Sequence, residues 1–415
     1  MSLPRGLRDY EPETYGIIEA IRDSFVRLSR IYNIRLMEPS SIELLETLQA
    51  KGGEEIINEI YEFMDKGGRG VGLRFDLTVG ITRYVCSRRD LPLPIKLGSF
   101  ASVWRYDEPQ FGRYRWFYQW DVEVYGDKSA ESYIEVLSFT DRMLRSAGLT
   151  DVKIEISDRR IVEGLLKSRV RQADRIPDIM RAMDKLGKKT KEQIIAEYVK
   201  KGIDEESLSE ALQIAQGGES LVNELQDNSK ELLEKVIDEA KSINLPLSVN
   251  LGIVRGLDYY SDIVFEAYSS EKRSIGALAG GGGYDILTSI FNRPGLKALG
   301  VAGGVDRLLL ALNKMREEAI KLVYVVYIQE TREEAIKIVS QLRDAGIPAE
   351  FSRADRLREG LKQAERDGAT VSVLVLPREI RDGQVRVKLM SDRSEELVKV
   401  GQLAETIRGI LNSNK

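Results

Sequence analysis

Apolar positions recur with two different spacings along the N-terminal part of the chain. Within residues 13–32 they fall three or four apart, which is typical of an amphipathic helix, and residues 130–147 repeat that spacing. Residues 152–157 alternate between apolar and polar side chains, as a strand with one buried face does. These patterns predict helices and strands in mixed order.

Two hairpins are predicted in the same part of the chain. Residues 59–85 contain two short strand-like runs that turn at residues 66–68, and a helix follows. In residues 105–126, Pro109 and Gly112 mark a turn or loop. The residues after this loop are rich in aromatic and β-branched side chains, so we expect them to form the return strand of a hairpin.

The pattern becomes helical throughout residues 158–243, where several amphipathic segments are separated by polar turns. Strand-like alternation returns at residues 247–268. A glycine-rich run follows at residues 276–287, and residues 299–312 read as a strand that leads into an apolar helix. The helical stretch therefore reads as an insertion within a fold that contains both helices and strands.

From about residue 321 strands alternate with helices, and the helices are predicted at residues 332–344, 355–367 and 396–411. This order is typical of an α/β unit with a mixed sheet. The predicted organisation is thus an α+β core of residues 1–157 and 244–320, a helical insertion of residues 158–243, and a C-terminal α/β unit of residues 321–415.

Composition describes an ordinary globular protein, with 42% hydrophobic and 31% charged residues among 415. No apolar run is as long as a membrane span, and the first residues do not resemble a signal peptide. The single cysteine, Cys86, excludes a disulfide framework and fits a cytoplasmic protein. A net charge of −4 does not indicate nucleic-acid binding, although a local basic surface would suffice for it.

The chain contains no histidine. Imidazole general bases and imidazole metal ligands are therefore excluded, and any chemistry must use carboxylates, arginines, lysines or bound Mg²⁺.

Candidate binding residues gather in the hairpin of residues 105–126. On an extended return strand, alternate positions share one face. That face would carry Arg113, Arg115, Phe117, Gln119, Asp121 and Glu123, with Arg105 on the incoming strand. Guanidinium groups suit phosphate oxygens, a phenyl ring suits a base, and an amide with a carboxylate suits a small polar ligand. An exposed hairpin with solvated charges is the alternative.

A second candidate lies in the segment LRFDLT, residues 73–78. Asp76 and Thr78 are two residues apart, so on extended backbone both could face one ammonium group. Alternatively, Asp76 is an ordinary N-cap for a helix that begins at Val79.

Further candidates follow in the second half of the core. In VRGLDYY, residues 254–260, Arg255 can supply a fixed cation, while Tyr259 and Tyr260 can line a pocket with a phenol available for hydrogen bonding. Arg307 falls at a strand-to-helix junction, where a helix N-terminus adds positive potential for a nucleotide. The alternative for Arg307 is a solvated position on an amphipathic helix.

Residues 105–119, RYDEPQFGRYRWFYQ, resemble motif 2 of class II aminoacyl-tRNA synthetases in the form found in histidyl-tRNA synthetases. Four further segments resemble that family in the same order: LRFDLT, VRGLDYY, GALAGGGGYDIL and the stretch around Arg307. Pro39 resembles the proline of motif 1 at the dimer interface. Gly283 stands where the family usually has an arginine, so the contacts of that arginine are in doubt. The resemblance covers essentially the whole chain.

This resemblance implies a class II antiparallel-sheet catalytic core, a helical insertion that leans on the tRNA acceptor arm, and a C-terminal anticodon-binding domain. The implied reaction is the ATP-dependent activation of L-histidine to histidyl-adenylate, followed by transfer to the 3′ end of tRNA(His). The implied protein is a cytoplasmic homodimer.

The resemblance also implies residue roles. Arg105 and Arg255 would be catalytic, and ATP would bind Arg105, Asp107, Arg113, Phe117 and Arg307, accompanied by Mg²⁺ without a dedicated protein metal site. Histidine would bind Asp76, Thr78, Gln119, Glu123, Tyr259 and Tyr260. In this scheme Glu123 and Tyr260 hydrogen-bond the two imidazole nitrogens, and Phe117 and Arg307 sandwich the adenine.

Two other functions stay open at this point. A non-catalytic paralogue, the regulatory subunit of ATP-phosphoribosyltransferase, would use the same pocket to sense histidine, but such paralogues usually lack the C-terminal domain and degrade VRGLDYY. A class II synthetase for another amino acid conflicts with VRGLDYY and with Glu123.

Overall fold

The computed structural model describes residues 2–50, 58–108, 112–186, 189–223, 230–254, 260–312, 321–352 and 356–413. The chain divides into two compact units, Met1–Met315 and Arg316–Lys415, which are described separately.

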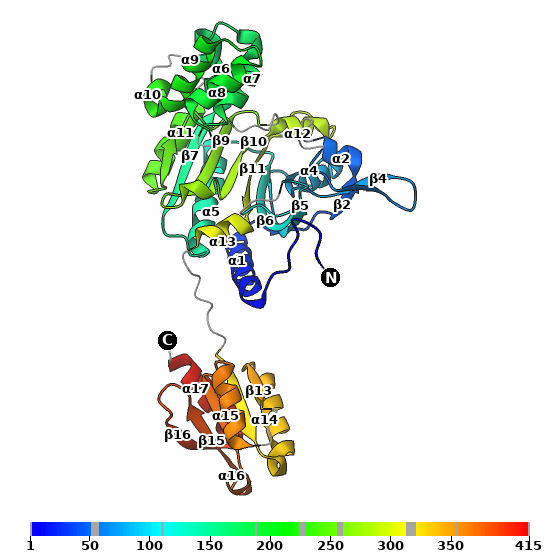
Figure 1. Cartoon of the computed structure of the whole chain (residues 1–415), viewed down its shortest axis with the longest axis vertical. Coiled ribbons are helices and arrows are strands. Elements are labelled where there is room, and N and C mark those ends of the chain that lie inside the picture. The colour runs from blue at the N-terminus through cyan, green and yellow to red at the C-terminus, as the bar shows by residue number, and fades with distance from the viewer. Residues whose placement is uncertain are drawn as a thin grey trace. The chain divides into compact units, whose positions relative to one another are not determined.

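An eight-stranded sheet organises the first unit (Figure 1). Its strands, in spatial order, are β1 (Arg35–Leu36), β5 (Ile95–Trp104), β6 (Trp116–Tyr125), β11 (Ala298–Gly304), β10 (Ala279–Gly283), β9 (Ile263–Ser269), β7 (Val152–Asp158) and β8 (Leu247–Val249). Only the pairs at the two edges, β1 with β5 and β7 with β8, are parallel. The predicted core, a largely antiparallel sheet with helices, is confirmed.

The period-2 pattern of β6 separates a core face from a polar face. Trp120, Val122 and Val124 are buried in the main hydrophobic core, where Phe25 and Phe139 lie beside Trp120. Phe25 belongs to α1 (Pro12–Ile31) and Phe139 to α5 (Ala130–Ser146), so these two helices cover that face of the sheet. The other face carries the polar residues of β6.

The helical insertion contains α6 (Arg159–Arg169), α7 (Ile176–Met183), α8 (Lys191–Val199), α9 (Glu205–Gln216) and α10 (Gly218–Asn223). Figure 1 shows these helices as a group of their own next to the sheet. The following helix, α11 (Glu231–Ser242), packs instead on α5 and β8 of the sheet layer.

A small three-stranded sheet, β2 (Ile42–Leu44), β4 (Gly70–Leu73) and β3 (Glu62–Met64), accompanies the large one. It contains the predicted hairpin, and α4 (Thr78–Ser87) follows as predicted. Leu77, Ile81 and Val85 pack with β5 in a second core cluster, so α4 is fixed against the end of the large sheet.

The second unit is a five-stranded mixed sheet with helices. Its strand order is β13 (Ala349–Phe351), β12 (Val323–Tyr327), β14 (Val371–Val375), β15 (Gln384–Leu389) and β16 (Glu395–Lys399). Its helices are α14 (Arg332–Asp344), α15 (Leu357–Arg366), α16 (Pro377–Arg381) and α17 (Leu403–Ser413). The predicted alternation of strands and helices is confirmed.

The helix predicted at residues 396–411 is wrong in its first part. Glu395–Lys399 form β16, which pairs antiparallel with β15, and α17 starts only at Leu403. Val398 is the one buried residue of β16, and its two neighbours are exposed, which fits a short edge strand. Pairing with the edge of β15 therefore outweighed the weak helical preference of this segment.

No helix among the described residues is long and apolar enough to cross a membrane.

Candidate active site

The polar face of the large sheet forms the floor of a cavity of about 440 Å³. Ten of the residues predicted to bind a ligand line it: Asp76, Thr78, Arg105, Asp107, Arg113, Phe117, Gln119, Glu123, Tyr260 and Arg307. The other two predicted residues, Arg255 and Tyr259, lie outside the described residues. The hairpin β5–β6 and the junctions at α4 and α13 (Val305–Ala311) therefore meet at one place.

A chain of hydrogen bonds connects two residues of the cavity lining, Arg105 and Thr78, through Gln119 and Asp121. Arg105 donates to Gln119 Oε1 at 3.3 Å, and the Gln119 amide donates to Asp121 Oδ1 at 3.3 Å. The Thr78 hydroxyl donates to Asp121 Oδ2 at 3.3 Å. Because Gln119, Asp121 and Thr78 are all buried, this network fixes the polar groups in orientation before a ligand arrives.

Asp76 and Thr78 lie at the start of α4, and Thr78 is its first residue rather than part of an extended segment. Asp76 Oδ1 accepts a hydrogen bond from the Val79 amide at 3.2 Å, as a capping carboxylate does. Asp76 and Thr78 nevertheless both line the cavity. The two interpretations left open for Asp76 are therefore compatible: it holds the helix start and also faces the cavity.

Glu123 is almost fully buried, with 1% of its surface exposed. Tyr284 donates a hydrogen bond to Glu123 Oε2 at 2.5 Å and contacts Tyr125 Oη at 3.2 Å. Burial, together with the negative charge of Glu123, raises the pKa of Tyr284 well above its ordinary value, so the phenol stays protonated and donates. Tyr260 also lines this end of the cavity.

Tyr284 was not predicted to belong to the site. Its segment, GALAGGGGYDIL, was singled out for its glycines, and the tyrosine that directly follows the glycine strand was the available signal.

Glycines on β10 and β11 keep room for the carboxylate. Gly300 pairs directly with Glu123, and a Cβ at Gly300 would overlap Glu123 Oε2. A Cβ at Gly281 on β10 would overlap the Gly300 carbonyl. The glycines therefore set the close approach between strands, as expected where backbone passes near a functional group.

The other end of the cavity is cationic. Arg105 is fixed by a hydrogen bond from its Nε to the Phe75 carbonyl at 2.9 Å, and its guanidinium lies 5.2 Å from the centre of the Phe117 ring. Arg307 donates to the Ala277 carbonyl at 3.1 Å. Burial, together with the positive charges of Arg113 and Arg105, lowers the pKa of Arg307. This arrangement of positive charge suits a polyanion such as a nucleoside triphosphate.

Arg115 does not share the ligand face, contrary to the prediction from alternation. The strand β6 starts only at Trp116, so the alternation does not extend back to Arg115. Arg115 donates to the carbonyls of Asp107 at 3.0 Å and Arg5 at 3.2 Å, and it lies 3.8 Å above the Tyr106 ring. Its role is therefore to hold the N-terminal segment against the hairpin.

Four acidic residues that line the cavity were also missed, namely Glu59, Asp184, Glu266 and Asp306. Glu266, on β9, lines the cavity and is close enough to Arg307 to affect its pKa. Asp306, at the start of α13, accepts hydrogen bonds from Arg8 and from Tyr10 at 3.1 Å. Burial raises the pKa of Tyr10 to about 12, with Arg8 acting in the opposite direction, so Tyr10 remains a donor. The N-terminal segment thus anchors the helix start that carries Arg307.

No group of three or more potential metal-ligating side chains of Asp, Glu, Cys or His occurs within the described ranges.

Comparisons with known proteins identify the family of the chain. Residues 6–308 match the family described as Histidyl-tRNA synthetase, and residues 322–410 match the family described as Anticodon binding domain. Histidine–tRNA ligase of Pyrobaculum calidifontis is 35% identical over 416 residues, which cover 98% of this chain and 97% of that protein. Histidine–tRNA ligase of Rhodopirellula baltica is 32% identical over 94% of each chain.

Among solved structures, histidyl-tRNA synthetase from Nostoc superposes with a TM-score of 0.82 at 23% identity, over 98% of this chain and 99% of that one. This likeness supports the fold, and the sequence matches show the family. The chain belongs to the histidyl-tRNA synthetase family of class II aminoacyl-tRNA synthetases.

Proposed function

We propose that this cavity binds histidine at the end formed by Glu123 and the triphosphate of ATP at the end formed by Arg105, Arg113 and Arg307. As a member of its family, the chain charges tRNA with histidine and uses ATP as a substrate. The observation that supports this arrangement best is the position of Gln119. Its side chain accepts a hydrogen bond from Arg105 at the cationic end, and along β6 Gln119 lies between Phe117 and Glu123.

In the first step a carboxylate oxygen of histidine forms a bond to the α-phosphorus, and pyrophosphate leaves. In the second step a terminal hydroxyl of tRNA attacks the carbonyl carbon, and AMP leaves. Both steps require in-line placement and neutralisation of negative charge more than proton transfer. Arg105 is suited to neutralise this charge, because its hydrogen bond to the Phe75 carbonyl holds the guanidinium in position.

The ammonium group of histidine would contact Asp76, Thr78 and Gln119, which line the cavity together. Glu123 would accept a hydrogen bond from one imidazole nitrogen, and Tyr260 would bind the other. Tyr284 contributes by holding Glu123 in position through its 2.5 Å hydrogen bond. A buried carboxylate selects a ring that can donate a hydrogen bond, because an analogue without the donor would leave the charge unpaired.

Phe117 and Arg307 would bind the adenine ring between them, and Asp107 would help to orient Arg113, whose guanidinium lies 3.8 Å from it. Arg255 remains the proposed second catalytic cation, and Tyr259 remains a proposed residue of the histidine pocket. Both proposals rest on the segment VRGLDYY.

Mg²⁺ would accompany ATP when ATP binds at the cationic end of the cavity. Glu266 lines the cavity near Arg307, and one carboxylate together with phosphate oxygens and water is a usual coordination for Mg²⁺. When bound, the ion would neutralise phosphate charge and orient the leaving group. Glu266 would hold it.

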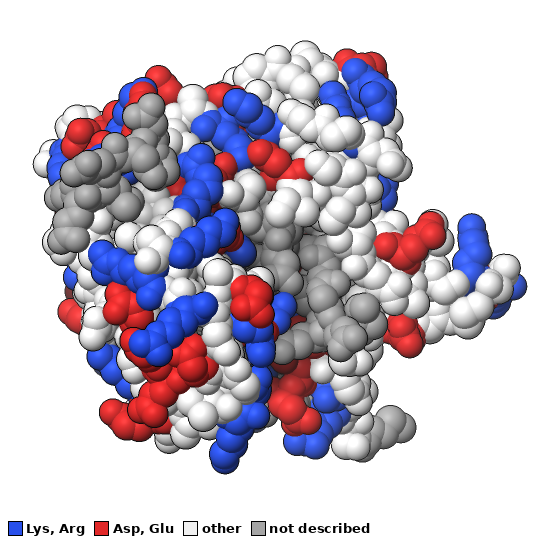
Figure 2. All heavy atoms as spheres, turned by 90° about the horizontal axis from the view of Figure 1, so that it is seen from above, with Lys and Arg blue, Asp and Glu red and all other residues white. Residues whose placement is uncertain are grey.

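Binding of tRNA involves the C-terminal unit, which matches the anticodon-binding family. We propose that the helical insertion, residues 158–243, contacts the acceptor arm, while residues 1–157 and 244–320 form the catalytic core. Figure 2 shows Lys and Arg side chains mixed with Asp and Glu on the face that it presents, rather than gathered in one basic patch. Charging of tRNA serves translation, so we also propose a cytoplasmic location.

A homodimer is proposed from a surface of exposed apolar side chains near Pro39. Ile42, Leu44 and Phe63 are exposed on one face of the small sheet, where Leu44 and Phe63 both pair with Val71, and Leu36 is exposed on β1. β1 is a short edge strand of the large sheet, and such an apolar surface favours a partner over water. A second copy of the chain would cover it.

Sedimentation equilibrium should therefore give twice the chain mass of 46.9 kDa. Ile42→Glu would place a charge in the apolar surface and should shift the protein toward the monomer. Val199→Glu, a change at an exposed apolar residue of α8 outside this surface, is the matched control and should leave the dimer intact. A monomeric wild type would refute the proposed dimer.

ATP–pyrophosphate exchange, measured with each of the twenty amino acids, tests the proposed function directly. Histidine should stimulate exchange, and removal of Mg²⁺ should abolish it. Equal stimulation by another amino acid would contradict the specificity. Binding of histidine without any exchange would instead favour a regulatory, histidine-sensing role.

A further inference from the structure

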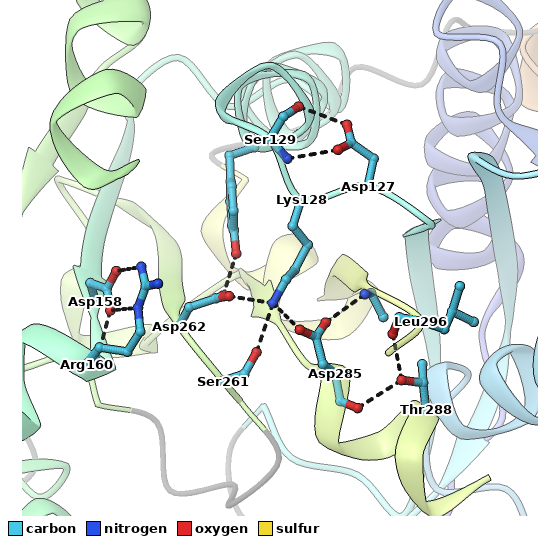
Figure 3. Close-up of polar contacts among 12 residues, drawn as sticks. Asp127, Lys128, Ser129, Asp158, Arg160, Ser261, Asp262, Asp285, Thr288 and Leu296 are labelled. Carbon is cyan, nitrogen blue, oxygen red and sulfur yellow. Dashed lines mark hydrogen bonds and ion pairs between the residues drawn. The ribbon is translucent and has the colours of Figure 1, made fainter. Parts of the chain in front are cut away.

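A buried lysine, Lys128, lies at the centre of a cluster of polar contacts (Figure 3). Lys128 belongs to the turn between β6 and α5, and 8% of its side chain is exposed. Its ammonium group contacts Asp262 Oδ2 and Asp285 Oδ2, both at 2.5 Å, and donates to Ser261 Oγ at 3.1 Å. One cation from the N-terminal half of the core thus bridges two carboxylates from the second half.

Both carboxylates have further partners that fix their orientation. Asp262 Oδ1 accepts a hydrogen bond from Tyr133 Oη at 2.6 Å, and Asp285 Oδ1 accepts one from the Ala298 amide at 2.9 Å. Loss of the ammonium group would leave two negative charges sharing a largely buried space, which is much less favourable than the complete network.

These carboxylates are adjacent in sequence to the two tyrosines of the histidine end. Asp262 follows Tyr260 by two residues, and Asp285 directly follows Tyr284. Backbone hydrogen bonds connect the same segments, since the Ser261 amide donates to the Gly283 carbonyl at 2.8 Å. Lys128 therefore ties together the two chain segments that present Tyr260 and Tyr284 to the cavity.

Gly283 leaves room for the Asp262 cluster. A Cβ at Gly283 would overlap Asp262 Oδ1 and would lie 2.6 Å from Tyr133 Oη. A side chain at this position would therefore enter the space of the Asp262 cluster. With glycine there, the charge that balances Asp262 and Asp285 reaches the cluster from the β6–α5 turn.

We propose that Lys128 is a positioning residue for histidine recognition. By neutralising Asp262 and Asp285 together, it holds Tyr260 and Tyr284 at the distance that lets them and Glu123 enclose the imidazole ring. The inference rests on the proposed binding of histidine at Glu123, and its test separates the two.

The test compares Lys128→Met, Lys128→Arg and Glu123→Gln with the wild type by ATP–pyrophosphate exchange, with KM for histidine and ATP, kcat and Tm measured for each. Lys128→Met keeps the length of the side chain and removes its charge. It should raise KM for histidine about tenfold, because the tyrosines lose their fixed positions, while KM for ATP stays within about twofold. Lys128→Arg should restore most of the affinity for histidine, since it keeps the cation.

A purely structural role would give other results. A lower Tm with an unchanged KM for histidine, or an equal rise of both KM values, would overturn the proposal for Lys128. If Glu123→Gln raises KM for histidine and Lys128→Met does not, the proposal for Lys128 alone is refuted. If Glu123→Gln has no effect, the proposed histidine site is wrong and the inference is refuted with it.

Should Lys128→Met fail to fold, Asp285→Asn replaces it. The Asp285 side chain is 34% exposed, so its loss of charge is better tolerated. This variant should raise KM for histidine about threefold, because one of the two tethers is weakened. An unchanged KM would overturn the proposal.

Discussion

Arg105→Ala should lower kcat for adenylate formation by about two to three orders of magnitude, the scale for removing one preorganised charged group. Arg105 combines a fixed guanidinium, held by the Phe75 carbonyl, with a hydrogen bond to Gln119. Because negative charge grows on the reacting phosphate in the transition state, the loss should fall on kcat more than on KM for ATP. Single-turnover formation of histidyl-adenylate measures this step.

The controls for Arg105 separate charge from geometry. Arg105→Lys keeps the positive charge but loses the planar pair of donors, so its kcat should lie between those of the wild type and Arg105→Ala. Arg113→Ala should mainly raise KM for ATP, because Arg113 is half-exposed and is proposed to hold the distal phosphates. A kcat of Arg105→Ala equal to that of the wild type would mean that Arg105 only binds ATP uniformly.

Local periodicity correctly predicts those site residues that lie on a regular strand. Alternation along β6 is sufficient to direct Phe117, Gln119 and Glu123 toward one face and Trp120 toward the core, and the structure has this arrangement. The same argument fails for Arg115, because periodicity cannot fix the residue at which a strand begins.

Contacts between distant segments are the part that the sequence does not reveal. Tyr284 and Glu123 are 161 residues apart, and their hydrogen bond depends on the order of strands β6, β11 and β10. Lys128 and its two carboxylates are likewise far apart in sequence, and the folded sheet brings them together. The edge strand β16 was mistaken for helix for a related reason, since its conformation depends on pairing with β15. Strand order and register are decided by the packing of the whole sheet rather than by local pattern.

Gly300→Ala should raise KM for histidine by at least about two orders of magnitude, because displacing a buried, paired charge costs about 3–5 kcal/mol. The added Cβ would overlap Glu123 Oε2 and would lie 2.9 Å from the Val122 carbonyl, so the carboxylate must move. Its hydrogen bond from Tyr284 would then break. Histidine-dependent exchange gives KM, and equilibrium dialysis with ATP alone should show that nucleotide binding persists.

Gly164→Ala provides the control for Gly300→Ala. Gly164 lies on α6, outside the residues that line the cavity, and no atom comes within 4 Å of an added Cβ. This variant should therefore keep the wild-type KM for histidine without lowering Tm, so that a glycine-to-alanine change is harmless in itself. If Gly300→Ala folds and also keeps the wild-type KM for histidine, then Glu123 does not contact the imidazole ring. The specificity for histidine would in that case have to come from other residues of the cavity.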